Sequence, residues 1–246
     1  INAMAVSLNK SDFGYIVDYF GGREDLEQGL LRVLHNLSFV EDPTRILRGV
    51  RFEKRYNITF EPQTLKLVKE AVNSNMLDRV SKERVWEEVK YILLEPRPSF
   101  VFSRLVDLQL WDSIFKDVSY EEIKDVLDEV PRSVNMLRSW DLAGPDEPWM
   151  VYLIAVLHRT CWETAREICT RYNFNKRQVD KLAAALGVAL VLAASGQIAA
   201  LSHCGIVAFP ISIPLRCGMS LSAATGCRHP ALRAELAVLH RDLPWG

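Results

Sequence analysis

The chain has 246 residues, of which 49% are hydrophobic, and its formal net charge is -1. A chain of this length and composition can bury a real core, as one large domain or as two to three small ones. The near-zero net charge excludes a global basic field for nucleic acid, so any contact with RNA or DNA must come from local basic patches.

The cysteines and the first residues bear on where the protein works. The five cysteines form neither a C-x-x-C pair nor an even framework, which disfavours a disulfide scaffold or a zinc knuckle and favours a reducing cytoplasm. The opening INAMAVSL lacks a positively charged leader and an initiator methionine at position 1. We therefore expect a fragment from which upstream residues have been cut away.

Residues 1–37 carry the strand signals of the chain. The runs AMAVSL and GYIVDYF are short and β-prone, and the Gly21-Gly22 turn closes the second. REDLEQGL is predicted as a brief helix and LLRVL as a third short strand.

From Asp42 onward the pattern becomes helical and stays so. Asp42 followed by Pro43 is a helix-start signature, because a side-chain acceptor satisfies free amides while proline needs no partner at the first helical position. Apolar residues supply one side of this helix. Three arginines spaced three residues apart, here called the arginine ladder, take the other side: Arg45, Arg48 and Arg51.

Apolar spacing and helix-start residues predict further helices. One follows Pro62 and another starts at Ser81. Others are expected over roughly 99–111, 120–130, 133–140 and from about residue 149, after the break LAGPDEPW. The sequence thus predicts a mainly α fold, a helical array behind a small α/β remnant.

The composition shifts after Lys181, beyond which no lysine occurs. The run from Leu182 to Leu201 is about as long as a membrane span, but it is alanine-rich and interrupted by glycine and polar residues, so a packing helix is favoured. The later tail has no clean helical or alternating period. We hypothesise that it is out of register with the original gene, for example after a frameshift.

Glu41, Asp42 and Arg45 suggest a recognition chemistry. A carboxylate only accepts and a guanidinium only donates, so a fixed Asp42 and Arg45 would complement cytosine or adenine and repel guanine or uracil. Such a pair discriminates by roughly 1 to 3 kcal/mol. Asp42 can equally be a helix cap, and Arg48 and Arg51 a solvated or salt-bridged face, so the pattern alone leaves the choice open.

Four motifs between Ile1 and Val89 carry a family resemblance. EDPTRILRGVRF resembles the nucleotide-recognition motif EDxxR of the class II tRNA nucleotidyltransferases, which are CCA-adding and A-adding enzymes, and of their bacterial poly(A) polymerase relatives. INAM is similar to the end of the family's RRDFTINA motif, DYFGGREDL to its D-x-x-G-G-x-x-D-L motif, and VSKERVWEEV to its arginine-bearing neck motif. The resemblance extends more weakly to about residue 182.

The resemblance implies a domain order. Residues 1–37 would be the C-terminal remnant of the nucleotidyltransferase head, 38–95 the neck with its nucleotide-recognition helix, and 96–182 the helical body. The tail at 183–246 has no counterpart and remains of uncertain structure.

The resemblance also implies residue roles. Asp42 and Arg45 would read the Watson-Crick edge of the incoming CTP or ATP, Glu41 would hold Arg45, and Asn2 and Arg48 would also bind the nucleotide. A second set would form the joint between head and neck, or else an ordinary tight turn: Asp18, Gly21, Gly22 and Asp25. A third would brace the neck helices: Ser81, Glu83 and Arg84.

The implied activity is the addition of CMP or AMP residues from CTP or ATP to the 3′ end of tRNA, with Mg²⁺ as cofactor of the complete enzyme. In the family an Asp-x-Asp pair before INAM holds the metal, so we expect no catalytic residue and no metal ligand in this fragment, and no activity from it alone. A bacterial poly(A) polymerase and a non-catalytic helical RNA-binding module are the alternatives. We expect tRNA and nucleoside triphosphates as partners, no membrane, and a cytoplasmic location.

His158 in LIAVLHRT invites a metal reading, since some relatives carry His-Asp pairs in their helical bodies. Its neighbour here is Arg159 rather than an acid. A histidine on an otherwise apolar helix is then expected to pack or cap.

Overall fold

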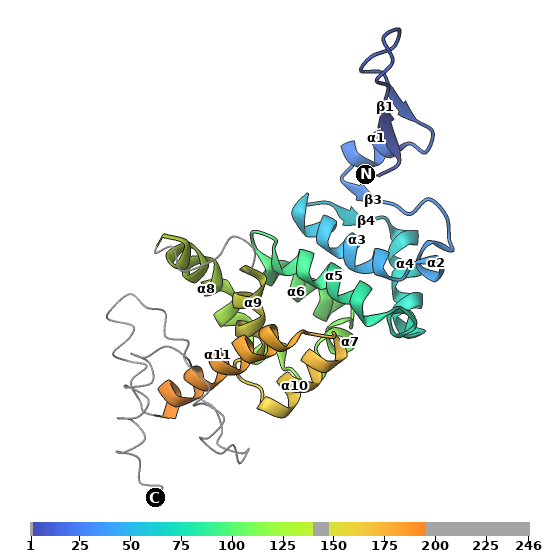
Figure 1. The fold of residues 1–246 in the computed structure, drawn as a ribbon. Helices are drawn as coiled ribbons and strands as arrows, with labels where there is room; N and C mark the ends of the chain where they lie inside the picture. The colour runs from blue at the N-terminus through green and yellow to red at the C-terminus, as the bar shows by residue number, and fades with distance from the viewer. Residues whose placement is uncertain (1, 140–147, 195–246) are drawn as a thin grey trace, which may run out of the picture. The chain divides into compact units, whose positions relative to one another are not determined.

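The computed structural model describes residues 2–139 and 148–194 (Figure 1). Its contacts group the chain into two units, residues 1–116 and 117–246. The described part is mainly helical, which confirms the predicted fold class. The predicted boundaries at 37, 95 and 182 stay a prediction.

The first unit begins with a small antiparallel hairpin. Strands β1 (Met4–Val6) and β2 (Ile16–Asp18) pair with Met4 opposite Asp18, as the two β-prone runs predicted. Helix α1 (Gly22–Glu27) follows.

The side chain of Asp18 binds the first two amides of helix α1, which begins four residues later. Its carboxylate accepts hydrogen bonds from the amides of Arg23 and Gly22, both at 2.9 Å. These amides lower the pKa of Asp18, because they stabilise its charged form. Gly21, which directly precedes the helix, has φ 70°, a left-handed conformation that glycine adopts without a steric cost.

A second, parallel pair joins β3 (Leu30–Leu31) to β4 (Thr59–Phe60). The expectation that the chain stays helical after Asp42 was wrong at β4. Asn57, at φ 52°, follows a helix end and turns the chain back toward β3. A two-residue strand is too short to show any alternation in the sequence.

The remaining elements of the first unit are helices. They are α2 (Ser38–Glu41), α3 (Thr44–Arg55), α4 (Pro62–Asn73), the 3-10 helix η1 (Met76–Arg79), α5 (Lys82–Leu93), α6 (Pro98–Asp107) and α7 (Trp111–Ile114). Helix α3 begins directly after the Asp42-Pro43 signature and contacts α2, α5, α6 and β4. It is the element around which this unit is built.

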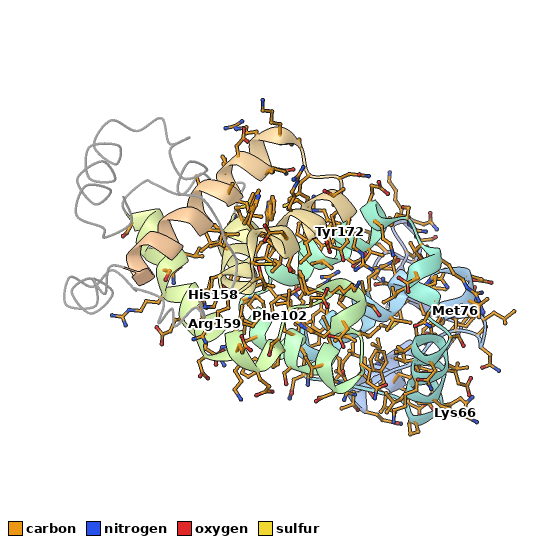
Figure 2. All side chains as sticks on the ribbon, turned by 90° about the horizontal axis from the view of Figure 1, so that it is seen from below. Lys66, Met76, Phe102, His158, Arg159 and Tyr172 are labelled. Carbon is orange, nitrogen blue, oxygen red and sulfur yellow. The ribbon has the colours of Figure 1, made fainter. Side chains whose placement is uncertain are left out.

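Two features fix helix α3 and its neighbours. On α3 itself, Ile46, Leu47 and Val50 are fully buried. Around α6, the ring of Phe102, labelled in Figure 2, meets the rings of Trp111 and Phe115 edge-on at centroid distances of 5.4 and 6.2 Å. Such aromatic pairs add to the stabilisation that burial already supplies.

The second unit contains α8 (Tyr120–Ser139), α9 (Pro148–Leu157), α10 (Trp162–Arg171) and α11 (Lys176–Ala194). The predicted break between residues 130 and 133 was wrong, because α8 runs through Pro131. Apolar residues on α8 are buried on both sides of the proline, for example Leu127 and Val134, and α8 packs on α9.

Helix α11 covers the first part of the apolar run from Leu182 to Leu201, and Leu182 is fully buried. Within residues 2–139 and 148–194, no helix combines the length and the hydropathy that crossing a bilayer would need. The rest of that run and the hypothesis of a frameshifted tail lie outside the described residues.

His158 is 3% exposed, and its Nδ1 donates to the carbonyl of Ala155 at 2.7 Å (Figure 2). Burial, reinforced by the charge of Arg159, lowers the pKa of His158. The ring thus lies in the helical core as a neutral group, as expected for a packing histidine.

The substitution Gly49→Ala tests how tightly α3 packs on β4. A Cβ at Gly49 would meet two ring carbons of Phe60 at 2.7 Å. Overpacking of this kind costs about 1 to 3 kcal/mol and outweighs the roughly 1 kcal/mol gained from helix propensity. We expect a lower free energy of unfolding in urea, by about 1 kcal/mol.

The matched control is Lys54→Ala on an exposed position of the same helix, with a change within about 0.5 kcal/mol. A Gly49→Ala chain as stable as the original would contradict the close approach of Phe60.

Candidate functional site

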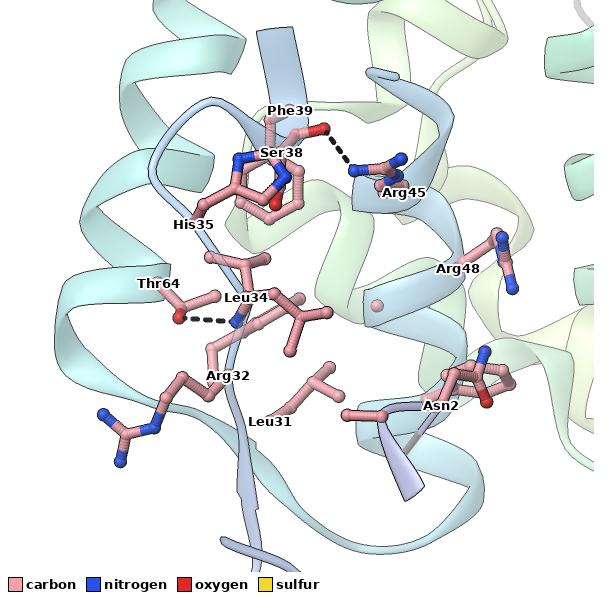
Figure 3. A pocket seen from close by; sticks show the side chains of 15 residues that line it. Asn2, Leu31, Arg32, Leu34, His35, Ser38, Phe39, Arg45, Arg48 and Thr64 are labelled. Atoms are coloured by element: carbon pink, nitrogen blue, oxygen red, sulfur yellow. Dashed lines mark hydrogen bonds between the residues drawn. The ribbon is translucent and has the colours of Figure 1, made fainter. Parts of the chain in front are cut away.

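A pocket of about 340 Å³ opens beside helix α3 (Figure 3). Its apolar lining includes Leu31, Phe39, Phe52 and Phe60. Its polar lining comes from four segments: Asn2, Arg32, His35, Ser38, Arg45, Arg48 and Thr64. An apolar floor with a few convergent polar and cationic groups is typical of a site for a small planar or anionic molecule.

Arg45 lines this pocket from the first turn of α3. Its Nη1 lies 3.5 Å from Glu41 Oε2 and donates to the carbonyl of Ser38 at 3.3 Å, the hydrogen bond drawn in Figure 3. Both of these contacts are made by Nη1, so the N–H groups of Nε and Nη2 of Arg45 are not used by them. The arrangement therefore leaves Arg45 able to donate to a further group in the pocket.

Asp42 lies in the extended link between α2 and α3, and its carboxylate is shared by two partners. Oδ1 accepts from the hydroxyl of Thr44 at 2.6 Å and from its amide at 3.2 Å, and Oδ2 accepts from Arg84 Nη2 at 2.9 Å. Burial raises the pKa of Asp42, but the Thr44 hydrogen bonds and the Arg84 charge outweigh burial and hold the pKa below its usual value. Asp42 is thus fixed as a carboxylate.

The structure therefore gives Asp42 and Arg45 different partners. The pocket lining includes Arg45 and leaves Asp42 outside it, beside Arg84. Their joint reading of a base stays a prediction.

The arginine ladder divides into two parts. Arg48 lines the pocket, with its Nε 3.8 Å from Glu88. The side chain of Arg51 is only 11% exposed, and its nitrogens lie 3.3 Å from Glu95 and 3.9 Å from Glu88. Its guanidinium also lies 5.3 Å from the centre of the Tyr91 ring. Arg51 is therefore a buried structural cation.

Glu88, between these two arginines, has its pKa raised. Burial is the main cause, and the charges of Arg48 and Arg51 oppose it without cancelling it.

The structure places the other predicted residues as follows, and their roles stay predictions. Asn2 is exposed and lines the pocket. Asp25 binds Arg32 at 2.9 Å, and a Cβ on Gly22 would meet Met4 Cγ at 3.2 Å. Ser81 precedes α5, and Glu83 and Arg84 lie in its first turn.

Sequence reasoning did not single out Arg32 and His35, the two ionisable pocket residues that it left unnamed, or the hydroxyl residues Ser38 and Thr64. Arg32 had a signal, because it is a cation inside the short apolar run LLRVL. His35 follows that run directly and had no period or motif to single it out.

Comparison with known proteins gives these residues a context. Residues 57–121 match the family model described as the probable RNA and SrmB-binding site of polymerase A. An A-adding tRNA nucleotidyltransferase of Geobacter sulfurreducens is 38% identical over 183 residues, which are 74% of this chain and 21% of that protein. The chain belongs to the tRNA nucleotidyltransferase and poly(A) polymerase family.

Solved structures of this family share the fold. A CCA-adding enzyme in complex with ATP aligns at a TM-score of 0.68 and 28% identity, covering 98% of this chain and 58% of that one. The Thermotoga maritima CCA-adding enzyme complexed with tRNA aligns at 0.67 and 27%, covering 96% and 57%. The chain thus spans about a fifth of the Geobacter nucleotidyltransferase and somewhat more than half of these structures.

The substitution Arg84→Met tests the pairing of Asp42. Removing this cation deletes both a hydrogen bond and a favourable charge, so the pKa of Asp42 should rise toward its usual value. A lowered carboxyl pKa supplies stability that is present above the unfolded-state pKa and is lost as the pH falls through the folded-state pKa. The variant should therefore have a lower free energy of unfolding at neutral pH, and this free energy should fall less than that of the original chain as the pH is lowered through the pKa of Asp42. Carbon-detected NMR titration of the Asp42 carboxyl measures the shift.

Lys82→Met is the matched control, because Lys82 pairs with Asp78 at 3.0 Å on the neighbouring turn. An unchanged Asp42 titration in Arg84→Met would mean that the two side chains do not pair in solution.

Proposed function

We propose that this chain supplies nucleotide selection and tRNA binding in a tRNA nucleotidyltransferase that adds CMP or AMP residues from CTP or ATP to the 3′ end of tRNA. The observation that carries the proposal is the guanidinium of Arg45, held by Glu41 within the EDPTR motif and lining a pocket of ligand size. The Geobacter nucleotidyltransferase and the CCA-adding enzymes in complex with ATP and with tRNA support it.

The nucleobase would lie on the apolar lining beside Arg45. Arg45 would donate to the ring nitrogen of adenine, or to the ring nitrogen and carbonyl of cytosine. Asp42 lies outside the pocket lining, so in the proposed role it would accept from the amino group of a base that extends past the lining toward it. A carboxylate has about four acceptor positions, and Thr44 and Arg84 leave capacity on it.

The phosphates would lie toward the polar rim. Arg48 brings positive charge to the lining and Asn2 brings an amide, whereas Arg32 is already paired with Asp25 and Glu61. Such groups bind phosphate oxygens through charge-assisted hydrogen bonds. We include Asn2 and Arg48 among the nucleotide-binding residues on this ground.

Mg²⁺ would belong to the complete enzyme. Among residues 2–139 and 148–194, no three His, Cys, Asp or Glu side chains converge as a metal site. The described residues therefore do not fit the ion, and we assign it no ligand here.

The tRNA would contact the neck and body. The family model that matches residues 57–121 describes a probable RNA-binding site, which favours an RNA contact in this stretch. We keep the proposed division into head remnant at 1–37, neck at 38–95 and body at 96–182. We also propose the cytoplasm as the place of action.

The substitution Arg45→Ala tests the selection of nucleotides. The unmodified chain should bind ATP and CTP more tightly than GTP and UTP. Loss of the only reading group that lines the pocket should reduce that preference about tenfold, because a specific base contact of this kind discriminates by roughly 1 to 3 kcal/mol. Isothermal titration with the four nucleotides measures the ratios.

Arg55→Ala is the matched control. Arg55 lies on the same helix with a similar exposed fraction, but it pairs with Glu95 and lies outside the pocket lining. Equal binding of all four nucleotides by the unmodified chain would overturn the proposed function.

A further inference from the structure

His35 contacts Glu41, although no motif of the sequence marks His35 as a site residue. It lies in the loop between β3 and α2, and its Nε2 is 3.4 Å from Glu41 Oε2. The same carboxylate oxygen lies 3.5 Å from Nη1 of Arg45. His35 and Arg45 thus share one oxygen of Glu41.

The backbone around this contact is fixed while the Glu41 side chain is not. Ser38 and Phe39 are buried, and the Ser38 amide donates to the carbonyl of His35 at 3.2 Å. Helix α2 therefore has a set position. The side chain of Glu41 at its end is 52% exposed, so its direction depends on the two donors that face it.

The direction of Glu41 matters because of what it leaves free on Arg45. With Nη1 of Arg45 directed to Glu41 and to the Ser38 carbonyl, the planar guanidinium has one corner fixed. Because the guanidinium is planar, fixing Nη1 also fixes the directions of its remaining N–H donors. If Glu41 turned into solvent, Arg45 would keep its charge and lose much of this orientation.

We propose that His35 is a positioning residue for nucleotide selection, which acts by holding Glu41 against Arg45. The inference rests on the proposed function of this pocket. His35, Ser38 and Arg45 all line the pocket, and they lie on the same side of it (Figure 3). Because all three side chains of the contact are about half exposed, His35 adds little to stability, and its effect lies in the choice between nucleotides.

The test is nucleotide titration of the purified chain and its variants. His35→Ala should lower the ratio of ATP affinity to GTP affinity about threefold, the size expected for a partly exposed contact, while the urea midpoint stays the same. His35→Gln should restore most of the ratio, because its amide can place a donor near the position of Nε2. Asn36→Ala, on an exposed neighbour in the same loop, is the matched control and should keep the full ratio.

A double-mutant cycle separates action through Glu41 from a direct contact with the base. In a Glu41→Ala background, His35→Ala should cause no further loss, since the group it holds is gone. Fully additive losses would overturn the inference in favour of direct contact, and an unchanged ratio in His35→Ala would overturn it outright. A lack of preference in the unmodified chain would instead overturn the proposed function, and the inference with it.

Discussion

The ion pair between the buried Glu53 and the partly exposed Arg104 adds to the apolar contacts that hold helix α3, and every residue of the pocket that α3 carries depends on that position. Glu53 is 4% exposed and accepts from Nε and Nη2 of Arg104 at 2.8 and 3.2 Å, which ties α3 to α6. Removing Arg104 would leave the carboxylate of Glu53 buried without its cation, which costs about 3 to 5 kcal/mol in a fully buried pair and less here, because Arg104 is 22% exposed. The pair thus specifies where α3 lies against the apolar contacts that hold it.

Helix geometry then decides which arginines reach the pocket. Three residues advance a helix by about 300°, so a ladder with this spacing drifts by about 60° at each step. Arg45 and Arg48 stay near the pocket, while Arg51, roughly 120° from Arg45, turns toward the acids of α5 and Glu95. Arginines therefore line the pocket at one end of α3 and pair with partly buried acids at the other. A surface of three phosphate-binding arginines is not compatible with the burial of Arg51.

Much of the fold follows from local patterns, and the exceptions share a cause. The hairpin, α1 and the starts of α3, α4 and α5 follow from β-prone runs, turn glycines and helix-start residues. Strand β4 and the continuous α8 do not, because tertiary contacts decide them. A proline inside a helix costs about 3 kcal/mol, and the burial of several apolar residues along α8 exceeds that. The EDPTR motif pointed to Arg45, but Arg84 as the partner of Asp42 lies 42 residues away, beyond any spacing rule.

The position of Asp42 bears on the choice that the sequence left open between a helix cap and a ligand. Thr44 and Arg84 engage its carboxylate in a structural way, and the same contacts lower its pKa. In the proposed role, an amino group of cytosine or adenine needs an ionised acceptor at a fixed position. A free aspartate would be ionised at neutral pH but would rotate, whereas one held by Thr44 and Arg84 is both charged and fixed in direction. The structural contacts of Asp42 are therefore compatible with a base-reading carboxylate, but Asp42 lies outside the pocket lining, so its reading of a base stays a prediction.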